Sequence, residues 1–162
     1  KGVVDGVSMV TNVDIENAQR EWGEGIVRIA SKYREGGDYV EAAEKHIDTL
    51  YAYGSGIVLF KPTMASIQQF RHTFEGALSY FVASNSECPE DNGFALKGWT
   101  KVRFENSGVI INGDHAIAMG NYFFSDQGGT ETKVEYTFGY IEDEEGALRI
   151  QLHHSSIPAS TT

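Results

Sequence analysis

The sequence predicts an α+β domain in which helices come first and an antiparallel sheet follows. Between residues 15 and 50, apolar side chains recur mostly three or four positions apart, the spacing of helices that bury one face. Beyond residue 76, segments rich in β-branched and aromatic residues alternate with turn-forming residues, which is typical of strands joined by short turns. Helices followed by a run of strands is the pattern of the α+β class.

Length, charge and cysteine count limit the domain organisation and the partners. A chain of 162 residues can build one core, so we expect a single domain over residues 1–162. The net charge of −10 repels nucleic acid and anionic lipid, and no apolar run reaches the roughly 20 residues of a membrane span, so we expect no nucleic acid and no membrane as partner. The start at Lys1-Gly2-Val3 has no initiator methionine, which leads us to expect a domain excised from a longer or multi-domain precursor.

Two helices are predicted near the start of the chain. Residues 1–10 show no clear period and are expected to form a loose lead-in. Thr11 and the acidic residue three positions later resemble a capping box, and Gly36-Gly37 is a stop signal, so the first helix lies between them. Asp38 then serves as the N-cap of a second helix, which is expected to end before Gly54.

The remaining elements are predicted to be mostly strands. A buried strand at 57–60 is stopped by Pro62, which cannot donate to a sheet ladder, and a short helical turn is expected at 63–70. If the sheet that follows bends strongly, the space between it and the helices becomes a cone-shaped pocket. The later strands are expected at 76–84, 97–106, 108–112, 114–124, 132–142 and 147–156.

The last of these strands carries polar residues in an alternating pattern. Because neighbouring side chains of a strand point to opposite faces, Arg149, Gln151, His153 and Ser155 share one face, and Leu148, Ile150, Leu152 and His154 share the other. One interpretation is that the polar row is exposed to solvent and the two histidines are a chance pair. The other is that His153 and Ser155 point into a pocket.

A metal site is not expected from the residue pattern. His153 and His154 are adjacent on a strand, so they point apart and cannot bind one ion together. The single cysteine excludes a cysteine cage, and HExxH, GxSxG and P-loop motifs are absent from the sequence. The other histidines, His46, His72 and His115, are predicted to be structural or surface residues.

Three stretches of the sequence resemble one known family. These are Leu59-Phe60-Lys61-Pro62-Thr63, residues 70–81 (FRHTFEGALSYF) and the ending His153-His154-Ser155-Ser156. In this order they resemble the iota class of carbonic anhydrases, whose domains are similar to the association domain of calmodulin-dependent kinase II. The likeness spans nearly the whole chain. The sequence departs from the family pattern at Leu152, where the family commonly has a third histidine.

The resemblance implies a fold, an activity and a setting. The fold is an NTF2-like (nuclear transport factor 2-like) cone, with a helical hairpin packed on a strongly curved antiparallel sheet, and it is usually dimeric. The activity is the reversible hydration of carbon dioxide to bicarbonate. Some family members work without a metal cofactor, and manganese or zinc has been proposed for others. Bacteria and algal plastids are the settings of the family, so a bacterial cell or a plastid is the location that the resemblance implies.

The resemblance also implies the site residues. Hydroxyl groups would position water and stabilise the charge that builds on the carbonate oxygens, and His153 would accept a proton. For Thr63 a capping role and for Tyr80 a place in the core remain alternatives. The catalytic residues implied are Thr63, Tyr80, His153 and Ser155, flanked by His154 and Ser156. Aromatic side chains such as Phe60, Phe81 and Tyr136 are predicted to form walls that admit carbon dioxide and bind substrate.

Two other functions are alternatives to the carbonic anhydrase activity, and an oligomeric state is predicted as well. The cone could be a non-catalytic association module, or another enzyme such as an isomerase or dehydratase, since a fold alone does not settle function. A homodimer is predicted through the outer face of the sheet. The row Val134, Tyr136, Phe138 and Tyr140 is expected to lie on that face, because it adds more apolar surface than one core needs.

Overall fold

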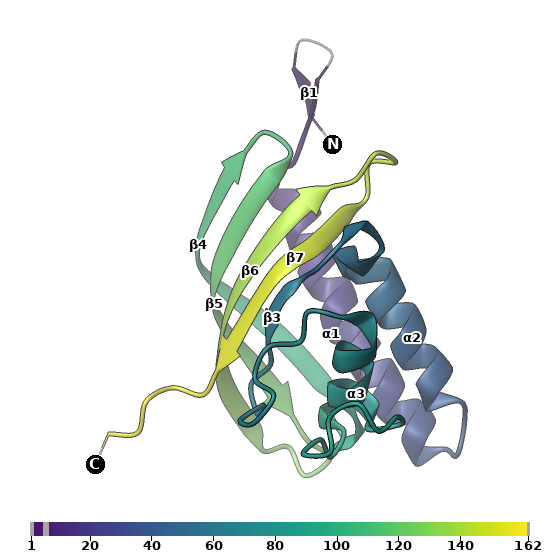
Figure 1. The fold of residues 1–162 in the computed structure, drawn as a ribbon. Coiled ribbons are helices and arrows are strands. Elements are labelled where there is room, and N and C mark those ends of the chain that lie inside the picture. Colours follow the sequence, from purple (N-terminus) through teal and green to yellow (C-terminus); the bar gives the residue numbers. More distant parts are fainter. Residues whose placement is uncertain (1, 5–6, 162) are drawn as a thin grey trace.

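The computed structural model describes residues 2–4 and 7–161, and it has two layers (Figure 1). One layer is a curved sheet and the other is formed by helices that lie against one of its faces. The elements are the strands β1 (Gly2–Val4) and β2 (Val7–Met9), the helices α1 (Asn12–Arg34) and α2 (Tyr39–Leu50), β3 (Leu59–Lys61), α3 (Phe74–Val82), β4 (Lys101–Asn112), β5 (His115–Ser125), β6 (Glu131–Glu142) and β7 (Leu148–Ser156), with single 3₁₀ turns at Ala52–Ser55 and Phe94–Leu96.

The two N-terminal helices form as the sequence predicts. Thr11 and Asp14 make a complete capping box, in which the Thr11 hydroxyl accepts from the Asp14 amide at 3.2 Å and the Asp14 carboxylate accepts from the Thr11 amide at 2.9 Å. Asp38 caps α2 by accepting from the Glu41 amide at 2.9 Å. Helix α1 ends before Gly36, whose φ of +75° is the left-handed conformation that suits glycine.

The lead-in predicted for residues 1–10 is partly ordered into strands. Strands β1 and β2 pair with each other as a two-stranded antiparallel sheet. Figure 1 shows this hairpin standing away from the main sheet. The expectation of a loose segment is therefore wrong for the strand residues, while residues 1, 5 and 6 of that segment lie outside the described part of the chain.

The strand predicted at 76–84 is wrong, because this segment forms helix α3. The Thr73 hydroxyl accepts from the Gly76 amide at 3.1 Å and caps the helix. Every residue from Gly76 to Val82 is buried, so α3 has no polar face from which a helical period could be recognised.

The short helix predicted at 63–70 is also absent, and a turn-rich loop takes its place. The carboxylate of Glu90 accepts from the backbone amides of Ser66, Ile67 and Gln68, at distances from 2.7 to 3.2 Å. These amides therefore donate to the Glu90 side chain and not to backbone carbonyls, as they would within a helix.

The main sheet has the strand order β3-β7-β6-β5-β4. Strands β4 to β7 form the antiparallel run that the sequence predicts, and β3 adds at the edge in parallel to β7, which the sequence does not reveal. The two strands predicted at 97–106 and 108–112 are one strand, because the expected turn at Ser107 is a bulge in the pairing with β5. Gly120 faces this bulge, where an added Cβ would lie 2.0 Å from the Glu105 carbonyl oxygen.

A second irregularity changes the faces of the last strand. In the pairing of β6 with β7, Gly139 lies opposite Leu152 and Tyr140 opposite Ile150, so the register skips Gln151. Ile150 is therefore buried on the side of His153, although the simple alternation places these residues on opposite faces. The alternation holds beyond the bulge, where His153 and Ser155 are buried and His154 is exposed.

The inner face of the sheet contains the aromatic row that the sequence analysis assigns to a dimer interface. Val134, Tyr136, Phe138 and Tyr140 are each at most 2% exposed and pack in the core. The predicted place of this row on the outer face is therefore wrong, because the helices cover the side of the sheet to which β6 turns its aromatic residues. None of the helices in the described residues is long and apolar enough to cross a membrane.

Candidate active site

A small cavity lies between the helices and the inner face of the sheet, where β3 runs beside β7. Its volume is about 10 Å³, close to the smallest space that holds one water molecule. Aromatic rings form most of its wall, and hydroxyl and imidazole groups interrupt them. The lining residues are Trp22, Phe60, Pro62, Thr63, Tyr80, Phe81, Phe94, Tyr122, His153 and Ser155.

His153 is held at this cavity by packing on both faces of its ring. It lies opposite Phe60 in the parallel pairing of β3 with β7 and opposite Phe138 in the antiparallel pairing with β6. The imidazole stacks on the Phe60 ring with a centroid distance of 4.7 Å and on the Phe138 ring at 4.0 Å. Its two nitrogens are both engaged: Nδ1 lies 2.8 Å from the Tyr51 hydroxyl and Nε2 lies 3.1 Å from the Tyr122 hydroxyl.

A chain of hydroxyl groups continues from His153 along the cavity wall. The Tyr122 hydroxyl lies 2.5 Å from Ser155 Oγ, and Ser155 Oγ lies 2.6 Å from Thr63 Oγ1. The Tyr80 hydroxyl lies on the same cavity wall as Thr63 and accepts from the amide of Met64, the next residue along the chain, at 3.2 Å. Four different parts of the fold, β5, β7, the loop after β3 and α3, thus bring their hydroxyl groups to one place.

Burial keeps the titratable groups of this chain neutral. The pKa of His153 lies well below its ordinary 6.5, mainly because the ring is removed from water and secondly because of the nearby His46 and His154. Burial raises the pKa values of Tyr80 and Tyr122 well above 10, although hydrogen bonds from neighbouring groups oppose the shift. Because its pKa is lowered, the His153 imidazole is a weaker base than an ordinary histidine, which argues against it as the group that takes a proton from water.

The loop that carries Thr63 is fixed by a buried ion pair. Arg71 is 2% exposed and donates to both carboxylate oxygens of Asp91, at 2.7 and 2.8 Å. Its Nε also donates to the Gln68 carbonyl at 2.8 Å, and its backbone amide donates to the Phe60 carbonyl at 2.7 Å. These bonds tie Arg71, at the end of the loop, to β3, the strand that precedes the loop. They therefore restrict where Thr63 can lie.

The structure brings together some of the site residues predicted from the sequence and separates others. Six of them line the cavity: Phe60, Thr63, Tyr80, Phe81, His153 and Ser155. Three lie outside it. The Tyr136 hydroxyl donates to Asn106 Oδ1 at 2.6 Å, Ser156 binds the Glu135 carboxylate at 2.7 Å, and His154 is exposed on the other face of β7. The alternation of β7 accounts for the last two.

Three residues that contact the His153 ring are missed by the sequence analysis: Trp22, Tyr51 and Tyr122. Tyr122 lies on the inward row of β5 together with Ala116, Ala118 and Phe124, so the alternation of that strand is a signal that could have found it. Trp22 belongs to the buried stripe of α1, where the pattern identifies it as core only. Tyr51 follows α2 without any pattern that marks it.

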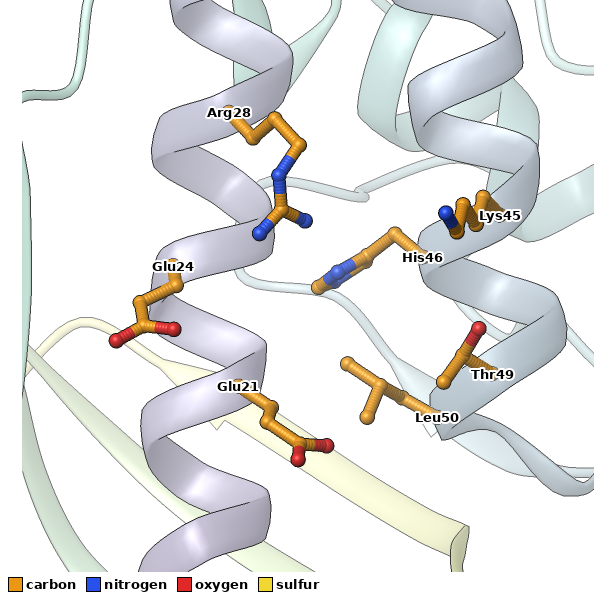
Figure 2. Close-up of a pocket in the computed structure, with 7 residues that line it drawn as sticks. All are labelled: Glu21, Glu24, Arg28, Lys45, His46, Thr49 and Leu50. Atoms are coloured by element: carbon orange, nitrogen blue, oxygen red, sulfur yellow. The ribbon is translucent and has the colours of Figure 1, made fainter.

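His46, predicted to be a structural or surface residue, is buried. It lies at the bottom of a groove of about 460 Å³ between α1 and α2, and Figure 2 shows its imidazole reaching from α2 towards α1. The ring is 5% exposed and packs over Gly25, where a Cβ would lie 2.1 Å from Nδ1. Its Nε2 has no hydrogen-bond partner among the described residues. Burial, helped by the charge of Arg28, lowers the pKa of His46 to about 3.

Metal-ligating residues do not gather at the cavity. Over residues 2–4 and 7–161 there is no group of three or more His, Cys, Asp or Glu side chains that could hold an ion. Cys88 is buried and is a free cysteine.

The domain has the NTF2-like fold. A protein of the NTF2-like family from Streptomyces avermitilis has a TM-score of 0.54 at 12% identity, covering 91% of this chain and 96% of that one. A protein described as a calcium/calmodulin dependent protein kinase II association domain, from Xanthomonas campestris, has a TM-score of 0.59 at 21% identity, covering 99% and 96%. Likeness at these identities shows the fold alone.

Comparison of the sequence identifies the family among proteins of this fold. The model of the metal-independent carbonic anhydrases matches residues 13–157. A metal-independent carbonic anhydrase from Nostoc is 44% identical over 152 residues, covering 92% of this chain and 74% of the relative. The crystal structure of a cyanobacterial iota-carbonic anhydrase in complex with bicarbonate is 41% identical, with a TM-score of 0.93 and 99% of each chain covered. The chain therefore belongs to the metal-independent carbonic anhydrases, and the predictions of this enzyme family and of its NTF2-like fold are confirmed.

Proposed function

We propose that the chain hydrates carbon dioxide in the cavity beside His153, by moving protons through the hydroxyl groups of Ser155, Thr63 and Tyr80. The observation that carries this proposal is that these hydroxyl groups line one cavity, where Ser155 Oγ lies 2.6 Å from Thr63 Oγ1 and the Tyr80 hydroxyl accepts from the backbone amide next to Thr63. A relay of neutral hydroxyl groups requires no group with a pKa near 7. This suits a site where burial keeps the imidazole and the phenols uncharged.

Tyr80 is the hydroxyl that reaches the substrate. Its oxygen accepts a hydrogen bond from the Met64 amide, whereas its own proton has no protein acceptor among the described contacts. Because Tyr80 lines the cavity, this proton is available to an oxygen of carbon dioxide. A donor placed there stabilises the charge that builds on that oxygen as the new bond forms.

The proposed step is balanced in protons and electrons. The oxygen of a water molecule forms a bond to the carbon of carbon dioxide, and one C=O π pair moves onto the oxygen that faces Tyr80. The water gives a proton to Ser155 Oγ, Ser155 gives its proton to Thr63, Thr63 to Tyr80, and Tyr80 to that oxygen. The immediate product is carbonic acid, which loses its acidic proton to solvent and leaves as bicarbonate. The protein returns to its starting protonation.

The size of the cavity sets a condition on binding. Its free volume of about 10 Å³ is that of about one water molecule, so carbon dioxide enters only as the wall widens. Phe60 and Phe81 on the wall supply the apolar surface that this small uncharged molecule contacts.

We expect hydration activity to survive removal of metal ions. Stopped-flow hydration rates would be measured before and after dialysis against a chelator, with the metal content determined by elemental analysis. The rate per chain is expected to be unchanged in metal-free protein and after zinc or manganese is added back, because the proposed step uses hydroxyl groups only. Loss of activity on chelation, restored by one ion, would contradict the proposal.

The pH dependence of the rate distinguishes the relay from a histidine base. No group of the relay titrates near neutrality, so kcat/KM for carbon dioxide is expected to be flat between about pH 6.5 and about pH 9. A base with the ordinary pKa of histidine would instead give a rate that falls tenfold per pH unit below its pKa. A fall of that kind, abolished by His153→Ala, would refute the relay.

We further propose that the chain forms a homodimer through the outer face of the sheet. A row of apolar or small residues crosses all five strands in register on this face: Ile110, Ile117, Gly139, Leu152 and Leu59. Ile110 is 69% exposed and Ile117 is 48% exposed. A groove of about 460 Å³ follows the part of this row on β5, β6, β7 and β3. A self-complementary apolar stripe of this kind suits the isologous interface of a twofold dimer.

The dimer is tested by charging the stripe. We expect light scattering to give a dimer for the wild-type chain at micromolar concentrations and a monomer for Ile117→Arg, because an arginine at the centre of the stripe would be buried without a partner. Ile67→Arg is the matched control, since Ile67 is 80% exposed on a loop and does not line this groove. A monomeric wild-type chain would rule out the dimer, and a dimeric Ile117→Arg variant would rule out this interface.

A further inference from the structure

We propose that Trp22 and Tyr51 are positioning residues that hold His153 in the tautomer with the proton on Nε2, and thereby set the direction of the hydroxyl relay. The proposal rests on the function proposed above. Trp22 Nε1 donates to the Tyr51 hydroxyl at 2.9 Å, and the same hydroxyl lies 2.8 Å from His153 Nδ1. All three side chains are buried in the core, with at most 2% of each exposed.

The direction of these bonds follows from the indole. An indole N–H can only donate, so it occupies a lone pair of the Tyr51 oxygen. The hydroxyl has one proton, and His153 Nδ1 is the one acceptor near it among the described contacts. Tyr51 therefore donates to Nδ1. A neutral imidazole that accepts at Nδ1 carries its proton on Nε2, because one ring nitrogen donates and the other accepts.

The opposite direction would leave a buried donor without an acceptor. If Nδ1 carried the proton, Tyr51 would accept from both Trp22 and His153, and its own O–H would be unpaired inside the core. Buried unpaired donors are costly and rare. The position of Trp22 thus selects one of two otherwise similar arrangements.

The selected tautomer determines which way the catalytic hydroxyls point. With the proton on Nε2, His153 donates to Tyr122 and Tyr122 donates to Ser155, which leaves the Ser155 proton for Thr63. Thr63 Oγ1, at 2.6 Å, is a nearer acceptor for that proton than the Glu135 carbonyl, at 3.3 Å. With the proton on Nδ1, Tyr122 would donate to Nε2 and take the Ser155 proton for its own oxygen, so Ser155 could no longer pass a proton to Thr63. The Trp22 indole thus influences the direction of the Ser155 proton through a chain of four hydrogen bonds.

The test combines a spectroscopic readout of the tautomer with kinetics. Nitrogen-15 NMR of the imidazoles, assigned with a His153→Gln variant, should show a protonated Nε2 and an unprotonated Nδ1 at His153 in the wild-type chain. In Tyr51→Phe, which removes only the hydroxyl, and in Trp22→Phe, whose smaller ring leaves room for a water that accepts the Tyr51 proton, both tautomers should be populated. In both variants kcat should fall about 10- to 100-fold with little change in KM, the scale of losing an outer partner of a functional histidine.

A matched control separates this role from a general loss of packing. Trp99→Phe also removes a buried indole N–H, which donates to the Phe94 carbonyl at 2.8 Å, and it should leave the His153 tautomer and kcat within twofold of wild type. A proton on Nδ1 in the wild-type chain would overturn the proposal, as would folded Tyr51→Phe and Trp22→Phe variants that keep full kcat. If Tyr80→Phe loses activity while those two variants keep it, only the role of Trp22 and Tyr51 fails. If Tyr80→Phe also keeps full activity, the relay itself fails.

Discussion

Tyr80→Phe is expected to lower kcat for carbon dioxide hydration by about 100- to 1,000-fold, the scale of removing one donor that stabilises a developing oxyanion. The variant keeps the ring, which stacks on Phe94 with a centroid distance of 5.6 Å and contacts Phe60 edge-on. It loses the hydroxyl that accepts from the Met64 amide and ends the proposed relay. Stopped-flow hydration assays at several carbon dioxide concentrations would measure this loss.

Tyr53→Phe is the control for this substitution. Its hydroxyl also makes one bond to the main chain, donating to the Arg71 carbonyl at 2.7 Å, but Tyr53 does not line the cavity. We expect Tyr53→Phe to keep kcat within about twofold of wild type, with a loss of stability of about 1 kcal/mol for the hydrogen bond. Comparable activity in Tyr80→Phe and wild type, with both variants folded, would remove Tyr80 from the mechanism.

Local signals explain why the N-terminal half of the helical layer is predictable. The capping box of Thr11 with Asp14, the cap at Asp38 and the glycines between the helices are each contained within a few residues. Helix α3 carries an equally clear cap at Thr73, yet its buried sequence fits a strand as well as a helix. A period can be recognised only where one side of an element faces water.

The parts of the sheet that the sequence does not reveal depend on pairing between strands. The bulges opposite Gly120 and near Gly139 arise from register, which no single strand encodes. The second bulge moves Ile150 to the inner face, so the simple alternation along β7 is wrong on one side of it. That alternation still places His153 and Ser155 correctly on the inner face, because both lie beyond the bulge.

The candidate site is predictable where it lies on the resembling segments and not where it depends on tertiary contact. Tyr51 lies 102 residues from His153 in the sequence, and Tyr122 lies 31 residues from it. Only the packing of α1 and β5 around the last strand brings Trp22 and Tyr122 to that imidazole. Hydrogen bonds of this kind have no spacing that a sequence could display.

His46 shows the same limit in the helical layer. It stands between charged and apolar neighbours on α2, so its own segment favours a surface position as much as a buried one. Gly25 on α1 decides the matter, because the lack of a Cβ there leaves room for the ring between the helices. A buried imidazole with an unpaired Nε2 disfavours the charged form, which gives the domain a sensitivity to acid.

The unfolding free energy is therefore expected to fall as the pH is lowered from about 6.5 to about 3. In the folded chain the pKa of His46 is about 3, whereas in the unfolded chain it takes its ordinary value of 6.5. Below pH 6.5 the unfolded chain thus binds a proton that the folded chain does not, and the folded state is disfavoured by up to about 1.4 kcal/mol per pH unit. The full effect at pH 3 is about 5 kcal/mol, and the lowered pKa of His153 acts in the same direction.

His46→Met isolates this contribution, because methionine fills a comparable apolar space and does not titrate. Urea unfolding at a series of pH values should give a slope for the variant that is smaller by one proton between pH 6 and pH 4, by about 1.4 kcal/mol per unit. At pH 7 the variant should be as stable as wild type or more so, since it no longer buries an unpaired nitrogen. An unchanged slope in His46→Met would show that His46 is protonated, or solvated, in the folded chain.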